Sequence, residues 1–205
     1  KEGKYFEKLN YAVGDAHEPG STFKLMGMIA ALEDKVVDVD TEIKTGNGEM
    51  MFFGKYKVKD SKRGGYGTIT AAKAFEVSSN VGLVKIINDN YKNNPKQFVD
   101  RLYNMGINKP LGLPIRGEGV PKIPYPTDPD WDGLDLPWMA YGYGVSLTPM
   151  QTLTFYNAIA NGGEMVKPMF LNEISNFGNT PTKVFSKQIL NPSICSEETL
   201  NKVQG

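Results

Sequence analysis

The sequence predicts an α+β fold in which helices predominate, and three observations support this. Residues 21–34 form a strongly apolar segment with the length of a core helix. Residues 94–97 and 148–151 carry helix-start signals, each with a proline at the first helical position and a glutamine two residues later. Residues 36–39 alternate as strands do, and residues 165–190 favour a hairpin.

Composition restricts the kinds of protein that this chain can be. Its 205 residues fit one ordinary domain. Lys+Arg 23 balance Asp+Glu 23, and because nucleic-acid binding calls for a basic face, we expect no nucleic-acid partner. The longest apolar stretch, Leu25–Leu32, is far shorter than the roughly 20 residues that cross a bilayer. The abrupt polar start, without a signal peptide, and the abrupt end lead us to expect an excised part of a longer protein.

The first elements lead up to the apolar helix. Two short strands are expected, at Tyr5-Phe6 and at residues 11–13, before a turn at Pro19-Gly20. Ser21 is a favoured N-cap residue, so a helix is expected from there to about Asp34. Its side chains leave hardly any polar face, which is typical of a helix inside a core.

A strand, a loop and two helices are expected next. Residues 36–39 are predicted as a strand, and residues 40–69 are rich in Gly and Lys and favour loop structure. Thr70 is placed to cap a second helix. Residues 78–80 break the pattern, and a third helix ends near Tyr91.

The second half is predicted to hold three more helices, a long loop and the hairpin. Because Gly favours helix ends, Gly106 and Gly162 mark the ends of the first two helices. In chain order we expect a helix from Asn94 to Gly106, a proline-rich loop over 111–137, a helix from Thr148 to Gly162, a hairpin over 165–190 and a helix beginning at Ser196.

Two short motifs are candidates for chemistry. Ser21-Thr22-Phe23-Lys24 matches Ser-x-x-Lys, and Ser78-Ser79-Asn80 matches Ser-x-Asn. Each pattern would occur about once by chance at this composition, so their placement decides. Residues i and i+3 share a helix face, which brings the Lys24 amine within reach of the Ser21 hydroxyl. Free backbone amides at the helix start suit a developing oxyanion.

Lys24 is predicted to have a lowered pKa. It lies in an otherwise apolar helix, and because burial disfavours an ammonium, its pKa should fall as a lysine base requires. Ser78 and Asn80 could hold the amine there. The alternative is structural: Ser21 caps a helix, Lys24 extends to water, and residues 78–80 are an inter-helix turn.

Three longer blocks, spanning residues 11–163 in family order, resemble the high-molecular-weight class B penicillin-binding proteins. The first surrounds Ser21, the second leads into Ser78, and the third lies in the second half of the chain. They are Glu18–Lys24; Gly65–Thr70 with Ala74–Val77 and Ser78–Gly82; and Tyr141–Gln151 with Ala158–Gly163.

The resemblance implies a fold and an activity. The fold would be that of penicillin-binding transpeptidases and serine β-lactamases, a mixed sheet packed by helices, of which this chain holds mainly the helical half. The activity would be that of a peptidoglycan D,D-transpeptidase. Ser21 would attack the D-Ala-D-Ala carbonyl of a stem peptide, Lys24 would accept its proton, Ser78 would relay a proton to the leaving amine, and Asn80 would hold Lys24 and the substrate amide. No cofactor or metal is implied.

The resemblance also implies partners and a location. β-Lactam antibiotics would acylate Ser21 as substrate mimics. The blocks look closest to the division-specific, septal type, which implies cell-division and glycosyltransferase partners. Such a protein would lie on the periplasmic, extracytoplasmic side of the cytoplasmic membrane, anchored by an N-terminal segment absent from this chain.

The sequence departs from the family pattern at its third motif. Lys-Thr/Ser-Gly should follow Ser-x-Asn, but the tripeptide present, Lys44-Thr45-Gly46, precedes Ser78 and is followed by Asn47. We interpret it as a chance match. We therefore expect the domain, residues 1–205, to be partial and to end at Gly205 before the strand with that motif, and this fragment to react slowly with β-lactams.

Two alternative functions remain open, and several other candidate sites are only weakly supported. A hydrolase of the same fold, either a D,D-carboxypeptidase or a β-lactamase, and a non-catalytic β-lactam sensor or division scaffold are the two rival functions. Residues 128–133 resemble the start of an EF-hand loop, but Met139 stands where the loop needs Glu, so acidic turns are favoured. His17, the sole histidine, is expected at a strand end or on the surface, and Lys55–Arg63 is expected to include an edge strand in solvent.

Overall fold

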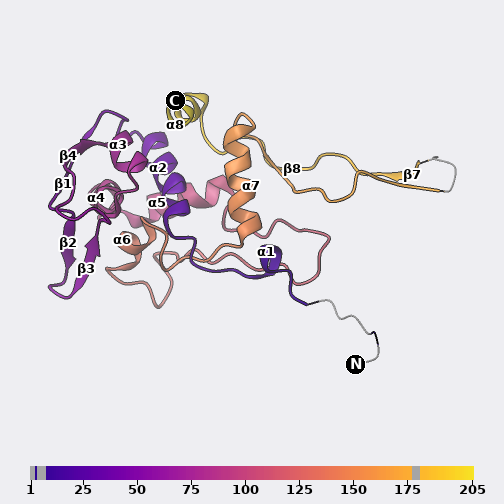
Figure 1. Ribbon diagram of the computed structural model, residues 1–205, viewed down its shortest axis with the longest axis horizontal. Coiled ribbons are helices and arrows are strands. Elements are labelled where there is room, and N and C mark those ends of the chain that lie inside the picture. The colour runs from indigo at the N-terminus through magenta and orange to yellow at the C-terminus, as the bar shows by residue number, and fades with distance from the viewer. Residues whose placement is uncertain (1–2, 4–7, 177–180) are drawn as a thin grey trace.

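The computed structural model describes residue 3, residues 8–176 and residues 181–205. The strand predicted at Tyr5-Phe6 lies outside these residues. Figure 1 shows the helices gathered in one body, with strands β1–β4 at one end and a long hairpin extending from the other. None of the described helices is both long and apolar enough to cross a membrane.

The core is built around helix α2 (Lys24–Glu33), which follows the 3₁₀ helix η1 (Gly20–Phe23). Every residue of α2 up to Leu32 is buried, as its all-apolar pattern predicted. Four helices pack around it (Figure 1): α3 (Ala71–Glu76), α4 (Asn80–Tyr91), α5 (Pro95–Met105) and α8 (Glu197–Gln204).

The entry to α2 differs from the predicted N-cap at Ser21. The segment that leads into α2 is a 3₁₀ turn whose N-cap is Pro19. Gly20 has φ +55°, which glycine adopts without strain. Ser21 therefore lies inside the turn and caps nothing. The Thr22 hydroxyl donates to the Pro19 carbonyl at 2.8 Å, which fixes the turn.

Residues 11–13, predicted as a strand, belong instead to the short helix α1 (Tyr11–Gly14). The Asn10 side chain accepts a hydrogen bond from the Ala12 amide at 3.2 Å, and this cap overrides the β-propensity of the segment.

Much of the segment from residue 36 to residue 69 was mispredicted. Residues 36–39 form no strand; instead a turn spans residues 38–41, in which the Asp38 amide donates to the Thr41 hydroxyl and the Val39 amide to the Asp38 carboxylate. The supposed loop that follows holds four strands in two antiparallel pairs: β1 (Glu42–Gly46) with β4 (Gly67–Thr70), and β2 (Glu49–Phe52) with β3 (Tyr56–Lys59). Part of the Lys-rich run is thus the predicted strand β3.

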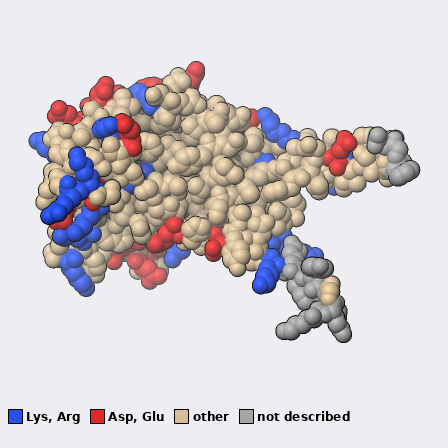
Figure 2. Space-filling model, viewed as in Figure 1, with Lys and Arg blue, Asp and Glu red and all other residues tan. Residues whose placement is uncertain are grey.

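Lysine side chains concentrate over the β2–β3 hairpin. Lys55, Lys57 and Lys59 are exposed, and Lys57 and Lys59 both pair with Glu49. Figure 2 shows Lys and Arg gathered over the end of the molecule where Figure 1 places these strands.

Most helix ends follow local signals. The Thr70 and Ser196 side chains cap α3 and α8 as predicted. Helix α7 (Pro149–Ala160) begins with the predicted capping box, in which Thr148 and Gln151 exchange hydrogen bonds. Asn94 is an exception, because its side chain makes no cap on α5, although Gly106 ends that helix as expected.

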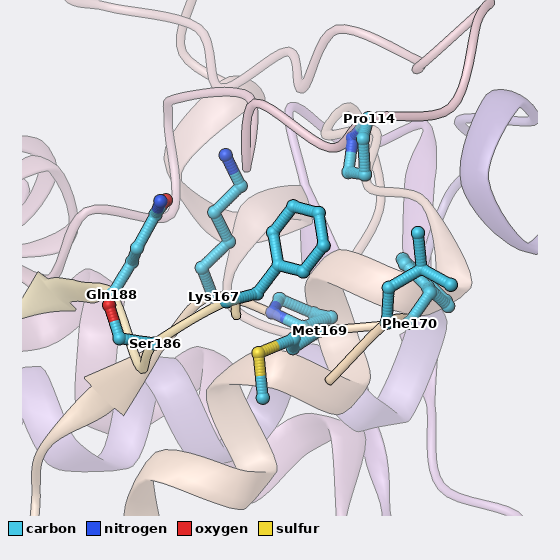
Figure 3. A pocket seen from close by; sticks show the side chains of 9 residues that line it. Pro114, Lys167, Met169, Phe170, Ser186 and Gln188 are labelled. Carbon is cyan, nitrogen blue, oxygen red and sulfur yellow. The ribbon is translucent and has the colours of Figure 1, made fainter. Parts of the chain in front are cut away.

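The long loop contains one further helix, α6 (Asp135–Met139). The predicted hairpin is present: β5 (Met165–Val166) pairs with β8 (Ile189–Asn191), and β6 (Glu173–Ser175) pairs with β7 (Pro181–Val184). At the base of the hairpin, Lys167, Met169 and Phe170 face Pro114 of the long loop across an apolar pocket (Figure 3).

Candidate functional site

The first residue of α2 is a buried lysine. Lys24 is 1 % exposed, and its ammonium donates three hydrogen bonds to the turn between α3 and α4. The acceptors are the Ser78 carbonyl at 2.7 Å, Ser78 Oγ at 2.9 Å and Asn80 Oδ1 at 2.6 Å. The two motifs, more than fifty residues apart in sequence, therefore meet through Lys24, as the sequence predicted.

Burial and these contacts act in opposite directions on the protonation of Lys24. Three acceptors match the three N–H groups of an ammonium, so they favour the charged form. Burial disfavours it more strongly and lowers the Lys24 pKa from 10.5 to about 8, while the negative charge of Asp60 opposes that shift. At pH 7 roughly one molecule in ten then carries a neutral amine, which can accept a proton.

Ser78 lies in a strained turn. Its φ is +54°, a conformation that costs a non-glycine residue about 1 kcal/mol or more. The turn is closed by the Ser78 and Ser79 amides, which donate to the carbonyls of Phe75 and Ala74. Because Ser78 Oγ accepts from Lys24 and the residue is exposed, its own hydroxyl hydrogen is free to point outward.

Neighbouring groups set the orientation of the Asn80 amide. Its Nδ2 donates to the Lys59 carbonyl at 2.8 Å, so the oxygen Oδ1 is the atom that faces Lys24. Reversing the amide would place its NH₂ group against an ammonium and an oxygen against a carbonyl, losing both hydrogen bonds.

Ser21 lies one turn before Lys24 and is exposed. The hydrogen bonds of the Lys24 Nζ within the described residues run to Ser78 and Asn80, and none of them joins Nζ to the Ser21 hydroxyl. The structure thus brings three of the four predicted site residues into direct contact, with Ser21 at the adjoining helix start.

The segment before Ser21 packs against the third sequence block. The Gly20 amide donates to the Gly142 carbonyl at 3.1 Å, and the Gly144 amide donates to Glu18 Oε1 at 2.9 Å. A Cβ atom on Gly142 would lie 2.0 Å from the Gly20 oxygen, so only glycine permits this approach. In the sequence, Gly142 stood out only as part of the third family block, Tyr141–Gln151.

Asp60 is a site residue that the sequence did not single out. It follows β3, and its carboxylate accepts from Ser79 Oγ at 2.9 and 3.0 Å and from the Val81 amide at 3.0 Å. The one sequence feature that could have pointed to Asp60 was its place as a single acidic residue directly after an alternating, basic strand.

The other sequence candidates lie outside this site. Lys44-Thr45-Gly46 belongs to β1, where the buried Thr45 hydroxyl donates to the Gly67 carbonyl inside the sheet, in keeping with a chance match. Asp128 and Asp132 accept backbone amides, as acidic turns do. Residues 8–176 and 181–205 offer no cluster of metal ligands. His17 is exposed and makes a short β-bridge with Leu147, the predicted strand-end role.

Comparison with curated proteins finds relatives that cover most of this chain. The profile of the family described as penicillin binding protein transpeptidase domain matches residues 1–205. Stage V sporulation protein D of Bacillus subtilis is 27% identical over 195 residues, which is 95% of this chain and 29% of that protein. Penicillin-binding protein PbpB of Mycobacterium tuberculosis is 30% identical over 162 residues (79% and 23%). Peptidoglycan D,D-transpeptidase FtsI of Escherichia coli is 28% identical over 171 residues (80% and 26%).

Solved structures show the same α+β fold. The transpeptidase domain of Burkholderia pseudomallei penicillin-binding protein 3 superposes with a TM-score of 0.76 at 26% identity, over 95% of this chain and 54% of that one. Penicillin binding protein 3 from Mycobacterium tuberculosis, complexed with aztreonam, gives 0.77 at 26% identity, over 95% and 41%. The chain spans about half of the former structure and less than a third of these curated relatives.

Proposed function

The chain belongs to the penicillin-binding protein transpeptidase domain family, and from this premise we propose that it carries the serine–lysine centre of a peptidoglycan D,D-transpeptidase. The observation that carries the proposal is the contact of the buried Lys24 amine with both Ser78 and Asn80, one helical turn after Ser21. A lysine with a lowered pKa one helical turn after the exposed Ser21 supports a role as its base in nucleophilic catalysis.

Acylation begins with Ser21. The neutral Lys24 amine takes the Ser21 hydroxyl proton while Oγ attacks the carbonyl carbon of the penultimate D-alanine in a stem peptide. The carbon–nitrogen bond to the terminal D-alanine then breaks. The proton passes from Lys24 through the Ser78 hydroxyl to the leaving nitrogen, which departs as an amine and leaves an ester on Ser21.

Deacylation completes the cross-link. An amine of a neighbouring stem peptide attacks the ester carbon and loses its proton to the Lys24 amine. As the carbon–oxygen bond breaks, Ser21 Oγ regains that proton, and the two stem peptides are joined by a new amide. Asn80 keeps Lys24 in place through both half-reactions.

β-Lactams enter the same scheme. Their strained amide takes the place of the peptide bond, so that Ser21 Oγ would open the ring and remain acylated. The complex of the Mycobacterium tuberculosis relative with aztreonam supports this assignment for the family.

The cellular setting is proposed on the resemblance of the sequence blocks and on the relatives' names. We place the whole protein on the extracytoplasmic side of the cytoplasmic membrane, anchored by a segment outside these 205 residues. A septal role with cell-division and glycosyltransferase partners fits relatives named FtsI and Stage V sporulation protein D. The strand with Lys-Thr/Ser-Gly, which would bind the substrate carboxylate, is likewise assigned to chain outside these residues.

Mass spectrometry of the full-length protein after exposure to benzylpenicillin tests the proposal. One acyl adduct is expected, on the peptide that contains Ser21, and Ser21→Ala should abolish it. Ser186→Ala, which removes an exposed serine on the distant hairpin, is the matched control and should keep the adduct. An adduct on another peptide, or one that survives Ser21→Ala, would contradict the proposal.

The same full-length protein, given a stem pentapeptide and an acceptor amine, separates transpeptidase from hydrolase. A transpeptidase yields the cross-linked peptide together with free D-alanine. Free tetrapeptide without the cross-linked product would instead identify a D,D-carboxypeptidase.

A further inference from the structure

The end of strand β3 holds the Ser78–Asn80 turn through two consecutive residues. The Asp60 carboxylate accepts from the Ser79 hydroxyl with both oxygens, at 2.9 and 3.0 Å, and from the Val81 amide at 3.0 Å. The preceding Lys59 carbonyl accepts from Asn80 Nδ2 at 2.8 Å. Lys59 and Asp60, at the end of β3, thus hold three successive residues at the start of α4: Ser79, Asn80 and Val81.

The turn requires such support because its conformation is strained. Ser78 has φ +54°, and in this conformation its carbonyl and its hydroxyl both accept from Lys24. Ser79 is 1 % exposed and also caps α4 through the Gly82 amide at 2.8 Å. Asp60 therefore bonds to the residue that joins the strained turn to a rigid helix.

The β2–β3 hairpin determines where Asp60 lies. The Asp60 amide donates to the Gly48 carbonyl at 2.9 Å. A Cβ atom on Gly65 would lie 2.2 Å from the Gly48 nitrogen, so the loop after Asp60 closes directly onto the loop before β2. Backbone packing thus fixes the position of Asp60, and the hydrogen bonds to Ser79 and Val81 orient its carboxylate.

We propose that Asp60 is a positioning residue for acylation: through Ser79 and Val81 it holds the Ser78 hydroxyl and the Asn80 oxygen on the Lys24 amine. Asp60 touches no reacting atom and acts through the turn. This inference rests on the proposed function, because it assigns Lys24 the role of base.

Asp60 also influences Lys24 electrostatically. Its negative charge raises the Lys24 pKa against the lowering effect of burial. Apart from Glu197, which is exposed at the start of α8, the other charged side chains on the helices packed around α2 are paired elsewhere. These pairs are Lys73–Glu76 on α3, Lys85–Asp89 on α4, Lys96–Asp100 on α5, Arg101 with Asp34, and Glu198–Lys202 on α8.

The test is the Asp60→Asn variant of the full-length protein, with the acylation rate by a fluorescent penicillin measured between about pH 6 and pH 10. Asparagine keeps the size of the side chain but loses one acceptor oxygen and the charge. We expect the rate to fall about tenfold, because the turn is no longer held. We also expect the midpoint of the pH profile to move down, because a nearby negative charge that raises the Lys24 pKa is lost.

Glu33→Gln is the matched control. Glu33 Oε2 also accepts from the start of a helix, from Ser196 and Thr199 at 2.6–3.1 Å, but it lies nine residues after Lys24, about 13 Å along α2. Its loss should lower thermal stability to a similar extent, while leaving the acylation rate and the pH midpoint unchanged. Equal effects of the two variants would show that Asp60 only stabilises the fold and would overturn the proposal.

If Asp60→Asn does not fold, Ser79→Ala tests the positioning role of Asp60 instead. It removes the hydroxyl bonds but leaves the Asp60 charge, so the rate should fall while the pH midpoint stays in place. A rate equal to that of the unmodified protein would overturn the positioning role. A wild-type protein that takes no penicillin at all would instead overturn the proposed function, which is a separate outcome.

Discussion

Lys24 carries an unfavourable burial energy that its proposed role as a base would explain. An ammonium that is 1 % exposed loses most of its hydration, and three hydrogen bonds recover only part of the loss. The lowering of the pKa from 10.5 to about 8 measures the balance, about 3 kcal/mol against the charged form. An apolar side chain at this position would avoid that cost, but it could not accept a proton.

The pH dependence of stability follows from this shift. Below about pH 8 both the folded and the unfolded states hold the Lys24 proton, and the folded state bears the full cost of burying the charge. Between about pH 8 and pH 10.5 the folded state has lost the proton and the unfolded state has not, so Lys24 becomes less destabilising as the pH rises.

Lys24→Met should therefore raise the free energy of unfolding above that of the wild type most strongly at pH 7. This difference in unfolding free energy should shrink by up to about 3 kcal/mol as the pH approaches 10.5. Urea unfolding at several pH values measures it. Lys92→Met, at an exposed lysine after α4, is the control and should show no such trend. A difference independent of pH would mean that the Lys24 pKa is unshifted.

At the residue scale the sequence predicted that Lys24 contacts Ser78 and Asn80, but it did not predict that Asp60 holds their turn in place. The contact of Lys24 with Ser78 and Asn80 followed from two motifs and an apolar helix. Asp60 was not predicted, because its role depends on a strand pairing between residues 49–52 and 56–59 that local patterns did not reveal. A hydrogen bond between residues nineteen positions apart leaves no periodic signal.

Among the elements, the loop that enters α7 packs directly against the segment that leads into α2. Gly142 and Gly144 both have positive φ, +86° and +70°, so each position strains any other residue. They differ in surroundings. A Cβ atom on Gly142 would meet the Gly20 carbonyl at 2.0 Å, whereas no described atom lies within 4 Å of one on Gly144.

Gly142→Ala should thus displace the segment before Ser21, and Gly144→Ala should not. Both variants should lose about 1 kcal/mol of stability to backbone strain. Only Gly142→Ala should also slow penicillin acylation of the full-length protein, by about tenfold or more, because the nucleophile shifts. Rates and unfolding free energies measured side by side decide the matter; equal rates for the two variants would show that the approach of Gly142 to Gly20 is irrelevant to acylation.

Elements with local signals were predicted well. The capping box at Thr148 and Gln151 and the Ser196 cap appear where expected, because a cap depends on side chains within one turn. Of the four strands between residues 42 and 70, β3 lies in the predicted Lys-rich edge strand, whereas β1, β2 and β4 were missed because they are short and depend on their partner strands. Residues 11–13 were assigned to a strand although the Asn10 cap makes them a helix.

At the scale of the whole molecule, the site lies where the helical core meets the strands. Helix α2 supplies Ser21 and Lys24 from the core, and the turn before α4 supplies Ser78 and Asn80. The β2–β3 hairpin closes over that turn from the other side, and Figure 1 places α4 next to these strands. Burial among the core helices thus lowers the Lys24 pKa, and the hairpin orients the Ser78–Asn80 turn that contacts Lys24.

The described residues form part of a larger unit in the relatives. They match about half of the solved Burkholderia pseudomallei transpeptidase domain, so a substrate-binding strand outside them is in keeping with the fold. We accordingly assign to this chain the nucleophile, the base and their support. Activity is a property of the whole protein, and for this reason every rate in these tests refers to the full-length molecule.

The pH dependence of penicillin acylation tests the central claim, that Lys24 is the base for Ser21. In the full-length protein, the second-order acylation rate should rise with pH and level off, with a midpoint near 8, because only the neutral amine can take the Ser21 proton. A rate that is independent of pH between about 6 and 9, or a midpoint near that of a free lysine, would contradict the claim.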